Sequence, residues 1–322
     1  MNILALESTC DETAAAILTD ALVVKASVVA SQDELHKRFG GVVPEIASRA
    51  HLERILPVIH QALEQAEMTL GDLDAVAVAN TPGLAGSLLV GLVAAKALCV
   101  ARNLPLVAVN HLQAHIYACH LTAAPQSVFP CIGLIVSGGH TSLYRCLGPL
   151  DFELLGATID DAAGEAFDKV AAMLGLPYPG GPAIQRAAAN GHRKTYSFPR
   201  SFYQDDERLD FTQLDLPPQQ VADLAASFQE AVVDTLVDKA FAALRRIGLR
   251  TLCVGGGVAA NSRLRERLEE EARHRDVELH VAPLRLCTDN AVMGAIAVER
   301  LKAGLTENLD LDVYPGVLRK RN

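Results

Sequence analysis

Two histidines one helical turn apart are the residues of this sequence that most directly indicate chemistry. His111 and His115 are separated by three residues, so in a helix both imidazoles lie on one face and can reach the same metal ion. In metalloproteases with this spacing a glutamate follows the first histidine directly, and this chain has Leu112 at that position. The pair therefore predicts a metal site that does not cleave peptides.

Carboxylates lie at two places where they could take part in this chemistry. The polar turn after the first predicted strand, residues 7–13, contains Asp11 and Glu12. Asp289 precedes the last predicted helix, where an aspartate is either an N-cap or, here, a third metal ligand. Spacing alone favours the cap.

A further acidic segment covers residues 160–169. Asp160 and Asp161 stand where a helix is expected to begin, so capping and compensation of the helix dipole explain them without any function. Asp168 lies beyond the first helical turn. A role in a site and an ordinary surface position both remain open for it.

Glycine-rich turns predict a second kind of site. In such turns the backbone N–H groups can approach phosphate oxygens without steric hindrance. Several turns of this type favour a nucleotide site over simple tight turns, although none has the spacing of a P-loop or a dinucleotide fingerprint. The turns are Ser137-Gly138-Gly139, Pro179-Gly180-Gly181-Pro182 and Gly255-Gly256-Gly257.

The elements that must position these residues alternate between strands and helices. A strand, a polar turn and a second strand are predicted over residues 3–18, and the same pattern returns over residues 131–146. This repetition predicts a duplicated α/β architecture with one such turn in each lobe. The least ordered part is expected at residues 190–220. Further strands are predicted at 75–79, 106–109 and 251–254, and helices at 51–67, 87–101, 111–121, 164–174, 222–246, 261–273 and 290–302.

Composition limits the possible classes of protein. Half of the 322 residues are hydrophobic and 21% are charged, which is typical of a globular chain. The net charge of −9 argues against a strongly basic surface that grips nucleic acid. Seven cysteines without a CxxC pair predict a reduced, cytoplasmic protein. The apolar stretch 84–101 contains Lys96 and is expected to be a buried helix, so no membrane contact is predicted.

Taken together, these motifs resemble the tRNA threonylcarbamoyladenosine synthase family. These tRNA N6-adenosine threonylcarbamoyltransferases include the Kae-type proteins and were once described as O-sialoglycoprotein endopeptidases. The order and spacing of the motifs agree over nearly the whole chain. The matching segments are residues 7–13, 40–49, 81–84, 111–115, 136–141, 160–169, 179–182, 255–261 and 287–290.

The resemblance implies a fold and an activity. The fold is the duplicated actin-like ATPase fold of the ribonuclease H-like class, with a central cleft between two lobes. Residues 1–125 would form the amino-terminal lobe, and residues 126–322 a nucleotide-binding lobe whose last helix packs back on the first. The implied reaction transfers a threonylcarbamoyl group from threonylcarbamoyl-AMP to the N6 amine of adenosine 37 in tRNAs that read ANN codons.

The resemblance also assigns roles to residues. His111 and His115 of the first lobe and Asp289 of the second would bind one divalent metal, with iron expected and zinc as the alternative. Asp11 and Glu12 would lie near the phosphate and the reacting carbonyl. The residues that would hold the adenylate, or ATP or ADP, are Ile135, Val136, Ser137, Gly138, Gly139, Asp168, Gly181 and Asn261.

Partners are implied in the same way. They are tRNA, a paralogous dimerisation partner that docks on residues 46–63, a P-loop ATPase, and a separate enzyme that supplies the adenylate. One departure from the family affects these expectations. The usual Phe-Ser-Gly-Leu-Lys run is missing, and Phe211 is followed by Thr-Gln-Leu-Asp-Leu-Pro-Pro. Contact with tRNA, partner docking or turnover could therefore differ from relatives.

Three other functions are weighed against this one. A protease is disfavoured because Leu112 replaces the water-activating glutamate. A kinase of the same fold does not need the paired histidines, whereas a carbamoyltransferase that acts on a small molecule shares the chemistry. The missing lysine run also leaves open an inactive scaffold that only binds partners.

Overall fold

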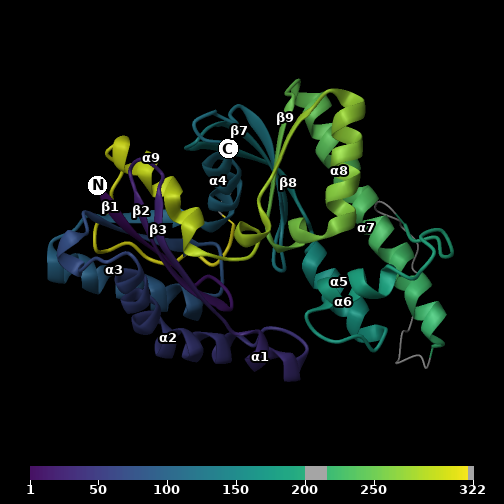
Figure 1. Cartoon of the computed structure of the whole chain (residues 1–322), viewed down its shortest axis with the longest axis horizontal. Coiled ribbons are helices and arrows are strands. Elements are labelled where there is room, and N and C mark those ends of the chain that lie inside the picture. Colours follow the sequence, from purple (N-terminus) through teal and green to yellow (C-terminus); the bar gives the residue numbers. More distant parts are fainter. Residues whose placement is uncertain (200–215, 318–322) are drawn as a thin grey trace. The chain divides into compact units, whose positions relative to one another are not determined.

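The computed structural model describes residues 1–199 and 216–317, which form two compact units (Figure 1). Unit 1 comprises Met1–Phe129, Leu147–Phe152 and Ala282–Asn322, and unit 2 comprises Pro130–Cys146 and Glu153–Val281. Much of the segment expected to be least ordered, and the altered run after Phe211 as far as Asp215, lie outside the described residues. The division of the chain into lobes after residue 125 stays a prediction.

Unit 1 is built on a five-stranded sheet in the order β3-β2-β1-β4-β5. β1 pairs antiparallel with β2 and parallel with β4. A short turn can join the antiparallel pair, whereas the parallel pair needs a longer crossover connection. The pairs β2–β3 and β4–β5 are antiparallel and parallel, respectively. The strands are β1 (Asn2–Glu7), β2 (Glu12–Thr19), β3 (Val24–Ser31), β4 (Ala75–Thr81) and β5 (Leu106–Asn110).

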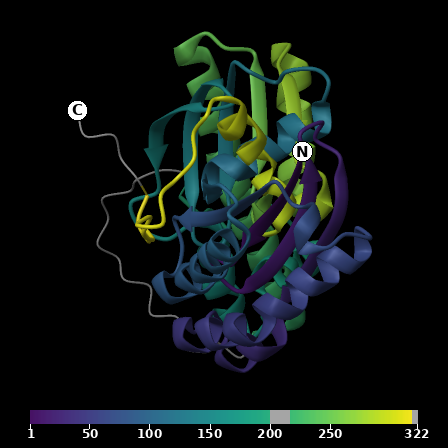
Figure 2. The same cartoon turned by 90° about the vertical axis from the view of Figure 1, so that its left-hand side faces the viewer.

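Helices cover both faces of this sheet. Leu4 and Leu6 of β1 share a core with α2 (Pro44–Gln65) and α3 (Ala85–Arg102), and Figures 1 and 2 show these two helices beside each other. Ala5 points to the opposite face, because successive strand residues alternate. There it meets Gly294 of the 3-10 helix η5 (Ala291–Ile296), where an added Cβ would come within 2.9 Å of the Ala5 Cβ.

Unit 2 repeats this plan. Its sheet has the order β10-β9-β6-β7-β8, with β6 antiparallel to β7 and parallel to β9. The predicted duplicated α/β fold is therefore confirmed. The strands are β6 (Cys131–Val136), β7 (Thr141–Gly148), β8 (Asp151–Ala157), β9 (Thr251–Gly255) and β10 (Glu278–Val281).

The helices of unit 2 form a second core beside the sheet. Phe167 of α5 (Ala163–Met173) packs with Ile184 of α6 (Gly180–Ala188) and Ala225 of α7 (Pro218–Ile247). α7 also contacts α8 (Ser262–Arg275), and α8 contacts β10. The remaining short helices are α1 (Asp33–His36), η1 (Lys37–Phe39), η2 (Leu70–Asp72), η3 (Gly257–Ala260), η4 (Leu284–Leu286) and α9 (Ala297–Lys302).

Some elements differ from the predicted ones for clear physical reasons. α2 begins at Pro44, seven residues before the expected start at 51, because proline suits the first helical turn. The last predicted helix, 290–302, is divided into the 3-10 helix η5 and the short α9. The sequence analysis did not predict three strands and one helix, namely β3, β8, β10 and α6. Exposed polar residues interrupt the hydrophobic pattern of each of these strands. α6 begins with two glycines, which do not favour a helix.

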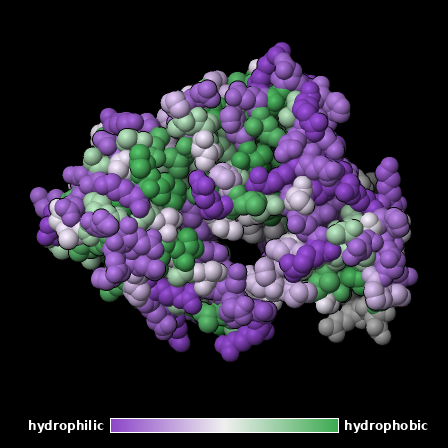
Figure 3. Space-filling view, in the orientation of Figure 1, coloured by the Kyte–Doolittle hydropathy of each residue, from purple (hydrophilic) through white to green (hydrophobic). Residues whose placement is uncertain are grey.

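α3 is, within the described residues, the helix whose length and composition would allow it to cross a membrane. Leu88 and Leu92 lie in the core of unit 1, whereas Leu89 and Val93 are exposed. The helix is thus buried along one face only, so the prediction of a buried helix holds for that face alone. Figure 3 shows hydrophobic patches of this kind among the hydrophilic surface of unit 1.

Adjacent glycines after β9 allow a test of this packing. Gly256 has φ +96°, and an added Cβ would lie 2.4 Å from the Val136 carbonyl oxygen, whereas nothing lies within 4 Å of the same position at Gly257. We expect Gly256→Ala to lower the free energy of unfolding by about 2 kcal/mol or more. Gly257→Ala should change it far less. Urea unfolding of both variants measures the difference, and equal effects would contradict this packing.

Candidate functional site

α4 (His111–Ala123) positions the two histidines. It begins directly after β5, and the Asn110 side chain caps it by accepting hydrogen bonds from the backbone N–H groups of Leu112, at 3.0 Å, and Gln113, at 3.2 Å. Both imidazoles are buried, with 4% of His111 and 0% of His115 exposed. The predicted helix is thus present, and it holds both rings on one face.

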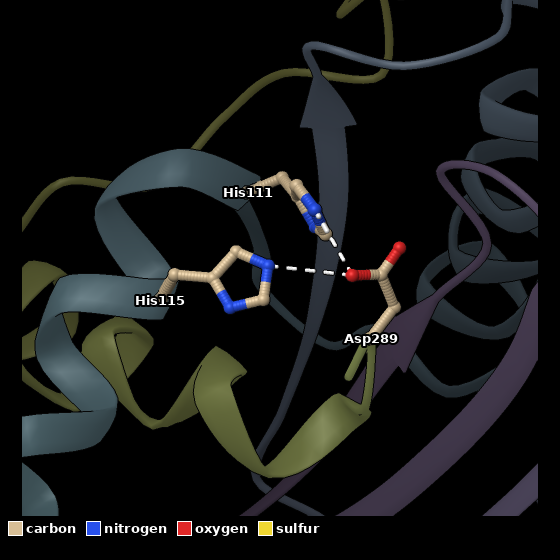
Figure 4. A group of neighbouring side chains, drawn as sticks. All are labelled: His111, His115 and Asp289. Carbon is tan, nitrogen blue, oxygen red and sulfur yellow. Dashed lines mark ion pairs between the residues drawn. The ribbon is translucent and has the colours of Figure 1, made fainter. Parts of the chain in front are cut away.

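Asp289 meets these histidines within unit 1. Its Oδ1 lies 3.4 Å from His111 Nε2 and 3.3 Å from His115 Nε2 (Figure 4). The N-cap of η5 is Asn290, whose side chain accepts from the backbone N–H of Met293, so the interpretation of Asp289 as a cap is wrong. The family resemblance implied that Asp289 comes from the second lobe; in the structure it belongs to unit 1, as do both histidines.

The pKa values reflect this close packing of charge. Burial would lower the pKa of His111, but Asp289 and Glu7 together raise it well above its ordinary value. Burial lowers the pKa of His115. The carboxyl of Asp289 has a pKa well below its usual range despite its burial, because His111 and His115 stabilise the carboxylate. The carboxylates of Glu7 and Asp289 therefore favour a positive charge beside the two imidazoles.

The residues present fit a metal ion. His115 is fully buried, and among the described residues neither of its ring nitrogens forms a hydrogen bond, although Nε2 lies 3.3 Å from Asp289 Oδ1. Unsatisfied polar atoms at this depth are costly. Metal coordination would satisfy one of these atoms. The ligand atoms of His111, His115 and Asp289 all lie within 4.8 Å of one another. Two imidazoles and one carboxylate are a donor set used for catalytic zinc and for non-haem iron, with positions left open.

The β1–β2 turn, which bears Asp11 and Glu12, is fixed through its backbone. The Cys10 carbonyl accepts hydrogen bonds from His51 Nε2 at 3.0 Å and from Ser87 Oγ at 3.3 Å. The Asp11 carbonyl accepts from the Gln32 N–H at 3.1 Å. His51 lies on α2, Ser87 on α3, and Gln32 between β3 and α1, so three separate segments hold this turn.

Sequence reasoning missed both side chains that hold Cys10. His51 is fully buried, and its Nδ1 lies 2.8 Å from Thr13 Oγ1. A polar residue on the buried face of a predicted helix was the available signal, but a satisfied core histidine gives the same pattern.

The carboxyl groups of the turn have altered acidity. Burial raises the pKa of Asp11, and burial together with the charges of Asp289 and Asp11 raises that of Glu12 well above its usual range. Both can also join Asp33 in an acidic group within 4.8 Å. Such carboxyls can take up or release a proton closer to neutral pH than ordinary surface acids.

The predicted phosphate-binding turn follows β6 in unit 2. Ile135 and Val136 are buried strand residues, whereas no atom of the described residues lies within 4 Å of the Cβ positions of Gly138 and Gly139. The turn adjoins the start of α5, where the Gly164 N–H donates to the Ser137 carbonyl at 3.1 Å. A glycine is needed at 164, since an added Cβ would lie 2.7 Å from that oxygen.

The other predicted nucleotide residues lie in α5, in α6 and directly after η3. Asp168 Oδ1 accepts from the Gly180 N–H at 2.7 Å, and Gly181 has open space beside it. Asn261 caps α8 by accepting from the Leu264 N–H at 3.0 Å. α5 packs against both α6 and η3, so these positions belong to one region of unit 2.

Asp160 and Asp161 do not cap α5. Its N-cap is Ala162, without a side-chain hydrogen bond. Asp161 Oδ1 instead forms an ion pair with Lys169 Nζ at 2.6 Å. The capping interpretation of this pair is therefore wrong.

Comparison with known proteins agrees with the motifs. Residues 23–296 match the family described as tRNA N6-adenosine threonylcarbamoyltransferase. Proteins of that name are 53% identical in Rhodopirellula baltica, with 98% of this chain and 97% of the relative covered, and 46% identical in Kosmotoga olearia, with 98% of each covered.

Solved structures resemble the chain in fold alone. Full-length HypF in the phosphate- and nucleotide-bound form has a TM-score of 0.58 at 15% identity, over 94% of this chain and 46% of HypF. The activator of the 2-hydroxyisocaproyl-CoA dehydratase from Clostridium difficile with bound ADPNP has a TM-score of 0.52 at 15% identity, over 94% and 97%.

The hold of His51 on the β1–β2 turn can be measured. We expect His51→Ala to lower the free energy of unfolding by about 2 kcal/mol, because it leaves a cavity and removes partners from Cys10 and Thr13. The control is His60→Ala, which changes an exposed histidine of the same helix. Urea unfolding should separate the two variants, and equal stability would exclude this role of His51.

Proposed function

We propose metal-assisted acyl transfer to tRNA as the activity of this chain, which belongs to the tRNA N6-adenosine threonylcarbamoyltransferase family. The threonylcarbamoyl group moves from threonylcarbamoyl-AMP to the N6 amine of adenosine 37 in tRNAs that read ANN codons. The observation that carries this proposal is 53% identity to a relative of that name over 98% of the chain.

The reaction needs an activated acyl donor, because the exocyclic amine of adenine is a poor nucleophile. The N6 lone pair attacks the carbamoyl carbonyl carbon, and the bond from that carbon to the phosphate oxygen of AMP breaks. One proton leaves the amine. The protein must therefore stabilise negative charge on the departing AMP and hold the amine close to the carbonyl.

His111, His115 and Asp289 hold a divalent cation, with iron as the expected metal and zinc as the alternative. Support comes from buried His115, whose ring nitrogens form no hydrogen bond with the described residues, and from the convergence of the three ligand atoms. When bound, such a cation supplies positive charge and open positions for substrate oxygens. Peptide hydrolysis is disfavoured because Leu112 is fully buried and carries no base.

Asp11 and Glu12 act on the phosphate and the reacting carbonyl. Asp11 either accepts the proton from the amine or orients the amine by a hydrogen bond. Its raised pKa and the fixed backbone of its turn suit both roles.

Unit 2 holds the adenylate, and ATP or ADP can occupy the same residues. The open backbone at Gly138 and Gly139 allows phosphate oxygens to approach N–H groups closely. Asp168 and Asn261 contact the ribose and the base. Asn261 donates one N–H to Gln229 at 2.8 Å, which leaves its second N–H available.

Partners supply the other steps in the cytoplasm, without membrane contact. A P-loop ATPase and an adenylate-forming enzyme are expected, and tRNA binding is shared with partners because the net charge is −9. A paralogous partner docks on α2. Leu52 and Leu56 lie one turn apart on that helix and are 65% and 67% exposed, so together they form an apolar strip on which a partner helix could pack.

Metal binding and transfer can be tested separately. We expect His115→Ala to lose the metal and to slow tRNA modification by roughly 100-fold or more, since a ligand is removed. Asp11→Ala should keep the metal and still lose most of the modification. Metal content and threonylcarbamoyladenosine formation are measured in a mixture with partners, adenylate-forming enzyme and unmodified tRNA.

His274→Ala changes an exposed histidine of α8 that has no proposed role, so it is the control for these variants and should match the wild type. Full modification by His115→Ala would refute the metal assignment. Full modification by Asp11→Ala would refute only the role of the turn.

The docking surface has its own test. Leu56→Asp places a charge in the centre of the proposed interface, so the variant should elute apart from the paralogue in size exclusion. Leu309→Asp changes a leucine of unit 1 that is 52% exposed and should leave the complex intact. A complex that survives Leu56→Asp would exclude this surface.

A further inference from the structure

We propose that Glu7 is a positioning residue that orients His111 for metal binding and balances the charge of the cation, without being a ligand. The inference rests on the proposed metal site and gives a role to Glu7, which the sequence analysis left without one. Glu7 ends β1, and only 3% of it is exposed. A carboxylate at such a depth needs partners.

His111 bridges two carboxylates through its two ring nitrogens. Its Nδ1 lies 3.0 Å from Glu7 Oε2, and its Nε2 lies 3.4 Å from Asp289 Oδ1. Both carboxylates only accept hydrogen bonds, and the contact with Glu7 is the shorter one, so we place the single proton of the neutral ring on Nδ1. The lone pair of Nε2 then points toward Asp289 and His115, as a metal ligand requires.

Glu7 is itself held in place and is not free to become a ligand. Its Oε1 accepts a hydrogen bond from the backbone N–H of Thr9 at 2.8 Å. Thr9 Oγ1 lies 3.3 Å from the same His111 nitrogen. The β1–β2 turn therefore fixes the carboxylate, and the carboxylate fixes the ring.

Charge gives a second, independent reason. In the described part of the chain, the ion pairs of Glu7 and Asp289 are formed with His111 and His115. With both imidazoles neutral, two buried carboxylates carry two negative charges. A divalent cation balances these two charges. If the charge of Glu7 were lost, part of the positive charge of the bound cation would have no carboxylate to balance it.

The central experiment compares Zn²⁺ affinities by competition with a chelator. Glu7→Gln keeps the shape and an acceptor for Thr9 but removes the charge, and we expect its affinity to fall roughly 10- to 100-fold. The matched control is Glu299→Gln, since Glu299 accepts a hydrogen bond from Tyr117 on the same helix as the histidines at 3.0 Å. Its affinity should equal that of the wild type.

Two readouts distinguish positioning from a general loss of structure. The thermal midpoint of metal-free Glu7→Gln should stay close to that of the metal-free control variant. In the Zn²⁺-loaded wild type, nitrogen NMR should show the proton of His111 on Nδ1. This measurement needs no variant, so it decides the question even if Glu7→Gln does not fold.

The possible failures can be told apart. If His115→Ala loses Zn²⁺ while Glu7→Gln binds it as tightly as the wild type, only the role of Glu7 is overturned. A proton on Nε2 of His111 in the Zn²⁺-loaded protein overturns it as well. If His115→Ala binds Zn²⁺ normally, the proposed metal site itself is wrong.

Discussion

The backbone and side chains of the β1–β2 turn depend on buried hydrogen bonds from several elements of unit 1. The Cys10 carbonyl is held by His51 and Ser87, and Glu7 is held by the Thr9 N–H. These groups lie where water cannot readily replace a lost partner, so each bond contributes to a single arrangement of the turn. Asp11 and Glu12 gain a fixed position, and so does the imidazole of His111.

The duplicated sheet uses the same connection for two different purposes. In unit 1 the turn between the first two strands carries acidic side chains, whereas in unit 2 the corresponding turn carries Gly138 and Gly139 with open backbone. One plan thus presents carboxylates in one unit and N–H groups in the other. This division suits a cation in unit 1 and phosphate oxygens in unit 2.

Much of this could be predicted from the sequence, because it depends on local patterns. The hydrophobic runs identified both hairpins, and the spacing of His111 and His115 identified a shared helical face. The exposed edge of a sheet leaves a weaker pattern, which explains why β3, β8 and β10 were not predicted. Glu7 and His51 gave no distinct signal, since their partners lie far away along the chain. Asp289 and Asn290 are adjacent and equally suited to capping, and only the three-dimensional packing distinguishes them.

Unit 1 is assembled from segments that are distant in the chain, and this affects how the protein is made. Both imidazoles emerge from the ribosome well before Asp289, because the whole of unit 2 is translated in between. A nascent chain can offer a cation the two rings but not the carboxylate. The proposed ligand set is complete only after the last part of unit 1 has been synthesised and has packed against β1, so the proposed metal site forms at the end of biogenesis.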